Sequence, residues 1–151
     1  MRLLAVGKAK QGPEQEMFAR YAKRLRPVLE LAEFAEGRGA PAEIKRREGQ
    51  AILAAVPAGA FVVALDEAGI RPSSLELSAM LEEWLGNGKP LCFVIGGAEG
   101  LDQALIQRAN RTLSLGSLTW PHMLVRVMLA EQLYRARSIA AGHPYHRAGR
   151  P

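Results

Sequence analysis

Short apolar runs alternate with amphipathic segments along the chain. Five runs have the length and composition of β-strands, and they cover residues 2–7, 29–34, 60–65, 91–95 and 112–116. The runs 60–65 and 91–95 are continuously apolar, which is typical of a strand buried on both faces. In contrast, 29–34 alternates apolar and acidic residues and predicts an exposed or edge strand.

The segments between these runs predict helices, at residues 13–25, 41–56, 73–85, 102–109 and 122–140. Ser73 followed by Glu76 three residues later is a capping-box signature. Pro121 precedes the longest helix, and Gly142 follows it, as expected at the two ends of a helix. Strand–helix alternation with buried strands predicts an α/β fold with a mostly parallel sheet. Without a linker or repeat, residues 1–151 form a single predicted domain.

Composition limits the function classes. The chain has 151 residues, one cysteine and three histidines, so an internal disulfide is excluded and a structural metal site is not expected. No apolar run approaches the roughly 20 residues that span a bilayer. The N-terminus also lacks the features of a signal peptide. These observations favour a cytoplasmic protein with no membrane partner.

The net charge of +5 is unevenly distributed. From residue 108 onward the chain has seven arginines and one acid, a net charge of +6, whereas the first 107 residues carry −1. Arginine suits bidentate phosphate binding, so this C-terminal excess points to a nucleic acid partner. A solvated basic face explains the charge equally well.

A glycine cluster, Gly96-Gly97-Ala98-Glu99-Gly100, follows the buried strand 91–95 directly. Glycines at such a position let a ligand approach the backbone closely. The cluster does not match GxGxxG, and the chain has no P-loop, so the standard nucleotide fingerprints are not met. A ligand site and a simple tight turn both remain open.

Two further segments contain candidate functional groups. The loop 114–122 combines hydroxyls with the apolar residues Leu118 and Trp120, which fits either a ligand loop or a capping loop with Trp120 in the core. In the last helix Glu131 and Arg135 are four residues apart on one face, a spacing that allows an exposed pair. Buried, the two side chains would instead orient a substrate or bridge subunits. The chain then ends in "HPYHR" (143–147), which either closes the fold or supplies histidine chemistry.

Five motifs, in order along nearly the whole chain, resemble one family. They are "LLAVGK", "ALDEAG", "FVIGGAEGL", "LSLGSLTWPHMLVRVMLAEQLYRA" and the closing "HPYHR". On these motifs the chain is similar to the RlmH family, which belongs to the SPOUT superfamily and methylates bacterial large-subunit ribosomal RNA. The resemblance implies methyl transfer from S-adenosylmethionine to N3 of a pseudouridine in 23S rRNA, within the large subunit or ribosome. It also implies a homodimer, no DNA partner, and a C-terminal trefoil knot, which is an exception to the usual absence of knots.

The resemblance further implies site residues. Those expected to bind the cofactor are Leu65, Gly96, Leu115, Gly116, Ser117, Leu118, Thr119 and Trp120. The candidates for taking the N3 proton are His146 and Tyr145, and those for positioning are Glu131, Arg135 and His122. RNA contacts are expected from Arg126, Arg135 and Arg147. In a dimer, the tail of one subunit is expected to cover the cofactor of the other.

Two alternatives from other classes remain. One is a non-catalytic dimer that binds the ribosome and retains a vestigial pocket. The other is an α/β enzyme that uses a different nucleotide, which the missing nucleotide motifs disfavour.

Overall fold

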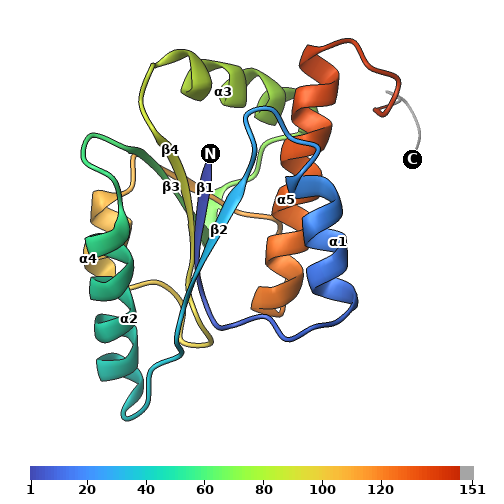
Figure 1. The fold of residues 1–151 in the computed structure, drawn as a ribbon. Coiled ribbons are helices and arrows are strands. Elements are labelled where there is room, and N and C mark those ends of the chain that lie inside the picture. Colours follow the sequence, from blue (N-terminus) through green and yellow to red (C-terminus); the bar gives the residue numbers. More distant parts are fainter. Residues whose placement is uncertain (147–151) are drawn as a thin grey trace.

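The computed structural model describes residues 1–146 and alternates five strands with five helices, as the sequence predicts (Figure 1). The strands are β1 (Arg2–Val6), β2 (Glu30–Phe34), β3 (Phe61–Ile70), β4 (Leu91–Ile95) and β5 (Arg111–Leu113). The helices are α1 (Pro13–Ala22), α2 (Pro41–Ala55), α3 (Ser74–Gly86), α4 (Gln103–Arg108) and α5 (His122–Ala140). The predicted capping box is present, with Ser73 Oγ accepting from Glu76 N at 3.2 Å and Ser73 N donating to Glu76 Oε2 at 2.7 Å.

All strand pairs of the sheet are parallel, in the order β2-β1-β4-β3-β5. The prediction of an edge strand at 29–34 is confirmed, because β2 forms one border of the sheet. Parallel strands share one carboxyl edge, so the segments that follow β1, β3, β4 and β5 come together there. In open α/β sheets this edge is where ligands bind.

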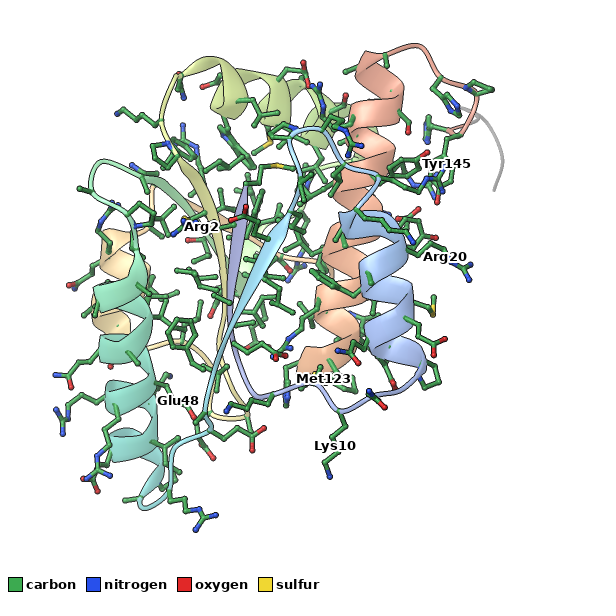
Figure 2. All side chains as sticks on the ribbon, in the orientation of Figure 1. Arg2, Lys10, Arg20, Glu48, Met123 and Tyr145 are labelled. Atoms are coloured by element: carbon green, nitrogen blue, oxygen red, sulfur yellow. The ribbon has the colours of Figure 1, made fainter. Side chains whose placement is uncertain are left out.

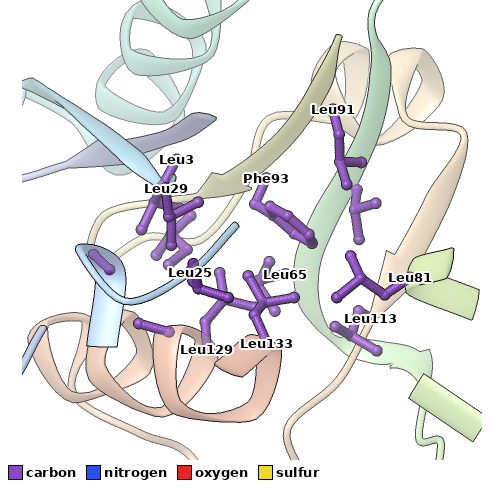
Figure 3. Close-up of a cluster of buried hydrophobic side chains, with 14 of the residues drawn as sticks. Leu3, Leu25, Leu29, Leu65, Leu81, Leu91, Phe93, Leu113, Leu129 and Leu133 are labelled. Atoms are coloured by element: carbon purple, nitrogen blue, oxygen red, sulfur yellow. The ribbon is translucent and has the colours of Figure 1, made fainter. Parts of the chain in front are cut away.

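Helices cover both faces of the sheet, with α2 and α4 on one side and α1, α3 and α5 on the other (Figure 1). Alternate strand residues enter two separate cores, since successive side chains of a strand point to opposite faces. In β4, Phe93 packs under α3 and α5, whereas Cys92 and Val94 pack under α2 and α4. Figure 3 shows the first core, where Leu129 and Leu133 of α5 meet strand residues.

Strand β3 is longer than predicted. The apolar run ends at Leu65, but the strand continues to Ile70, and both Leu65 and Ile70 pair with Leu113 across an irregularity in register. The polar residues between them bulge from the carboxyl edge. Gly69 is required in this bulge, because a Cβ there would lie 2.6 Å from the Leu113 carbonyl carbon.

Helix α1 is shorter than predicted. It ends at Ala22 rather than near residue 25, because Leu25 turns into the core, where it is 1% exposed. Within residues 1–146, none of the helices has both the length and the apolar character needed to cross a membrane.

Candidate active site

A cavity of about 750 Å³ (the larger cavity) opens at the carboxyl edge of the sheet. Three connecting segments form its walls: the β3 bulge, the glycine turn after β4, and the loop between β5 and α5. The lining includes Leu65, Asp66, Glu67, Ile95 to Leu101, Leu113 to Gly116, Leu118 to His122, Val125 and Lys45. Its size is typical of a site for a ligand of cofactor dimensions.

This lining contains all the residues that the resemblance implied for the cofactor, except Ser117. The loop after β5 is open toward solvent, with Leu118 68% and Trp120 39% exposed. The alternative that Trp120 belongs to the core is therefore wrong. Gly116 has φ +128°, and nothing lies within 4 Å of where its Cβ would be, so the backbone here faces open space.

The glycine turn is folded back on itself and is supported from α2. Gly100 N donates to Gly97 O at 3.1 Å. Behind the turn lies Glu48, which is 6% exposed and accepts from Gly37 N at 2.7 Å. A Cβ on Gly97 would lie 2.9 Å from Glu48 Oε2. The sequence gives no sign of this role for Glu48, because the contact joins two segments that are distant in the chain.

A smaller cavity, about 490 Å³, lies on the α1 and α5 side. Met17 and Tyr21 of α1 line it, together with Glu131 and Gln132 of α5 and the N-terminal approach to α3. The segment from Leu113 to Gly116 lines both cavities and separates them.

The C-terminal tail packs beside this smaller cavity, because Tyr145 contacts Tyr21 and Glu131 of its lining. Figure 2 shows Tyr145 next to α1 and α5. Tyr145 stacks edge-on against Tyr134, with ring centroids 4.8 Å apart. The Tyr145 hydroxyl donates to Glu131 Oε1 at 3.0 Å, and its oxygen lies 3.4 Å from the Tyr21 hydroxyl oxygen. The pair that the spacing of Glu131 and Arg135 allows is present, at 2.5 Å.

This packing favours the protonated hydroxyl of Tyr145. Burial, followed by the contacts with Tyr21 and the negative Glu131, holds the pKa of Tyr145 well above its ordinary value. Arg135 also lies 5.0 Å over the Tyr145 ring and 3.5 Å from His146 Nδ1. Tyr145, His146, Arg135 and Glu131 therefore form one cluster.

His122 is apart from this cluster. It lines the larger cavity at the first turn of α5, and its Nε2 is 3.7 Å from Glu36 Oε1. It is nine positions from Glu131 along the helix, about 13.5 Å along the axis. Within one chain, the structure thus groups the predicted catalytic residues around two neighbouring cavities.

Comparison with known proteins decides the family. The sequence model of a protein family described as "Predicted SPOUT methyltransferase" matches residues 1–146. The chain belongs to the SPOUT methyltransferase family.

Relatives in this family match over the full chain. The protein from Gluconacetobacter diazotrophicus named ribosomal RNA large subunit methyltransferase H is 65% identical, covering 100% of this chain and 99% of the relative. A protein of the same name from Acidiphilium cryptum is 55% identical, covering 100% and 96%. The crystal structure of a probable methyltransferase from Bordetella pertussis aligns with a TM-score of 0.60, covering 89% of this chain and 94% of that one, at 17% identity.

SPOUT methyltransferases use S-adenosylmethionine, and the larger cavity fits this cofactor. Asp66 and Glu67 provide carboxylates suited to hydroxyl groups, while Leu65 and Leu101 provide apolar contacts. The exposed backbone around Gly116 leaves room for a bound molecule. Sequence reasoning missed the acidic pair, since the bulge that presents it was not predicted.

One predicted RNA contact of this SPOUT methyltransferase is wrong. Arg126 is 2% exposed, and its guanidinium binds Glu33 Oε1 at 2.6 Å and the carbonyls of Val6 and Gly7 at 2.7 and 2.6 Å. It therefore joins α5 to the ends of β1 and β2 and is not available to RNA. Arg147, another predicted contact, lies outside the described residues.

Proposed function

We propose that this SPOUT methyltransferase transfers the methyl group of S-adenosylmethionine to N3 of a pseudouridine in 23S rRNA of the large ribosomal subunit. The observation that carries the proposal is the larger cavity, whose walls contain nearly every residue expected around the cofactor. The names of the full-length relatives support the RNA substrate. A cytoplasmic location follows from this substrate.

S-adenosylmethionine supplies a methyl group bonded to a positively charged sulfur, which is already a good leaving group. The protein then has two tasks, to orient the two reactants and to remove the N3 proton. Leu65, Gly96 and the loop from Leu115 to Trp120 bind the cofactor, the loop largely through its backbone. N3 forms its bond to the methyl carbon as the carbon–sulfur bond breaks, and the N3 proton passes to a side chain.

We assign the proton acceptor to His146. Tyr145 is a poor candidate, because its raised pKa keeps the hydroxyl protonated at neutral pH, where it acts as a hydrogen-bond donor. Glu131 is already bound by Arg135 and Tyr145. Arg135, which lies near His146 Nδ1, is suited to stabilise the negative charge that develops on the pseudouridine as N3 loses its proton.

The division between the two cavities supports a homodimeric enzyme. His122 and the cofactor residues surround one cavity, whereas Tyr145 and His146 lie beside the other. In our proposal, the tail of one subunit covers the cofactor cavity of its partner and thereby completes the site. The C-terminal trefoil knot expected for the family also stays part of this proposal.

The test is transfer of labelled methyl from S-adenosylmethionine to three substrates: purified 70S ribosomes, large subunits and deproteinised 23S rRNA. Mass spectrometry of nuclease digests locates the product, and calorimetry measures cofactor binding separately. We expect incorporation at a single pseudouridine. RNA in which uridine replaces that pseudouridine is the control and is expected to stay unmethylated.

The variants separate the assigned roles. His146→Ala is expected to lower the rate constant at saturating substrates by two or more orders of magnitude, as removal of a general base does. Tyr145→Phe keeps the ring packing and is expected to be less impaired than Tyr145→Ala. RNA binding without any cofactor binding or methyl transfer would instead favour the non-catalytic dimer.

A further inference from the structure

The positive charge available for RNA lies elsewhere in the folded protein than the charge count along the sequence indicates. Of the C-terminal arginines in residues 108–146, Arg126, Arg135 and Arg137 are each paired with a carboxylate. Arg108 and Arg111 donate to the carbonyls of Ala60 and Asn110. Three of the five arginines in this range are thus paired with carboxylates, which offsets most of the basic excess that the sequence places there.

A second concentration of charge lies near the N-terminus. The segment 8–26 contains six basic residues and two acidic ones, a net charge of +4. The basic residues are Lys8, Lys10, Arg20, Lys23, Arg24 and Arg26, and all are exposed. Within residues 1–146, none of the six is in an ion pair with a carboxylate.

The loop that carries Lys8 and Lys10 is held in place by a hydrogen bond to Glu33 of β2. Ala9 N, between the two lysines, donates to Glu33 Oε1 at 2.7 Å, and Glu33 is paired with the buried Arg126. Gly7, just before the loop, is next to His122 of the larger cavity, where an added Cβ would lie 2.9 Å from His122 Nε2. The backbone that carries these two exposed lysines is therefore held next to His122, a residue of the larger cavity.

Helix α1 continues the same positive surface to the smaller cavity. Met17 and Tyr21 line that cavity, while Arg20 and Lys23 of the same segment remain exposed. Arg24 lies 4.3 Å over the Tyr134 ring, which also packs against Tyr145 of the tail. Figure 2 shows Lys10 and Arg20 extending away from the body of the protein.

We propose that Lys8, Lys10, Arg20, Lys23 and Arg24 form the surface that binds the phosphate backbone of the substrate RNA. This inference rests on the proposed function, because it needs RNA as the substrate. The surface borders both cavities, so phosphates bound along it hold the target nucleotide beside the methyl donor. Arg24 is preorganised by its contact with Tyr134, which lowers the entropy lost on binding.

The test compares two variants that lose the same charge. The first combines Lys10→Gln, Arg20→Gln and Lys23→Gln. The control combines Arg38→Gln, Arg46→Gln and Lys89→Gln, which are exposed residues of the loop before α2, of α2, and of the turn before β4. Binding of each to purified 70S ribosomes is measured between 50 and 200 mM KCl (roughly the span over which phosphate contacts are most visible).

For the first variant we expect affinity for ribosomes to fall about 30-fold or more at the lower salt, and the slope of log K against log salt to decrease by about 2–3. The control is expected to stay within about threefold of the wild type. Equal losses in both variants, or an unchanged salt slope in the first, would overturn the assignment.

Two further measurements keep this outcome distinct from the proposed function. Calorimetry with S-adenosylmethionine is expected to give wild-type affinity for both variants, since none of the six positions lines the cofactor cavity. If the wild-type protein did not bind S-adenosylmethionine, the methyltransferase proposal itself would be refuted. Sedimentation velocity tests the subunit state, and a changed state in the first variant alone would assign the surface to subunit contact in place of RNA.

Discussion

Replacing Arg126 with methionine tests whether the buried guanidinium holds α5 against the sheet. Methionine keeps an unbranched side chain of similar length and removes every hydrogen bond. In the wild type the side chain of Arg126 is only 3% exposed and bonds one carboxylate and two backbone carbonyls. The substitution therefore leaves Glu33 without its partner and the carbonyls of Val6 and Gly7 without this donor.

The expected cost is about 3 kcal/mol in the free energy of unfolding. Removing one member of a buried ion pair costs about 3–5 kcal/mol, because the remaining charge is stranded. The lower end applies here, since the side chain of Glu33 is 27% exposed and also accepts from Ala9 N. For a chain of this length, the loss corresponds to a decrease in Tm of about 6–12 °C.

Urea denaturation followed by tryptophan fluorescence, at one fixed protein concentration, measures the effect. Arg137→Met is the control on the same helix. Its pair with Glu82 is partly solvated, with side chains 33% and 46% exposed, so we expect a loss below about 1 kcal/mol. Equal losses in the two variants, or a loss below about 1 kcal/mol for Arg126→Met, would refute the reasoning.

Three other predictions concern single sites. Gly69→Ala is expected to lower the free energy of unfolding by about 1–3 kcal/mol and to weaken cofactor binding, because its Cβ would meet the Leu113 backbone at 2.6 Å. Urea denaturation measures the first effect and calorimetry the second, and an unchanged cofactor affinity would contradict the prediction. Glu76→Ala is expected to lower Tm at pH 7, because it removes the carboxylate that accepts from Ser73 N at 2.7 Å. The hydrogen bonds from the Ser73 backbone and side chain lower the pKa of Glu76 below 4.5, so this stabilisation is present above pH 4.5 and is lost as the pH falls through the lowered value; a deficit in Tm that persists undiminished at pH 2 would contradict the capping box. Burial raises the pKa of the Cys92 thiol, which is 0% exposed, so we expect Ellman's reagent to react only after urea unfolds the protein, and rapid labelling of the native protein would exclude the buried position.

The order and type of the elements could be predicted because each depends on local pattern. Continuous apolar runs predicted the strands buried on both faces, and the alternation at residues 29–34 predicted the edge strand. The bulge in β3 could not be predicted in this way, because Asp66 and Glu67 end the apolar run, and the second pairing of Leu113 exists only in the folded sheet.

The site was predictable in its residues but not in its arrangement. Motif resemblance gave seven of the residues that line the larger cavity, although it missed the acidic pair of Asp66 and Glu67. It gave no distances, so the separation of His122 from the tail cluster came only from the structure. The burial of Arg126 depends on Glu33, 93 residues away, and charge counting along the chain cannot detect such a partner.

The segment from Leu113 to Gly116, which lines both cavities, has a thermodynamic consequence. A molecule that shifts this segment on filling one cavity changes the free energy of filling the other, and the coupling is the same in both directions. If RNA tightens the binding of S-adenosylmethionine by some factor, the cofactor must tighten the binding of RNA by that same factor. The same reciprocity holds for the two products of the transfer. The affinity of the demethylated cofactor and the affinity of the methylated RNA are therefore coupled through the segment from Leu113 to Gly116.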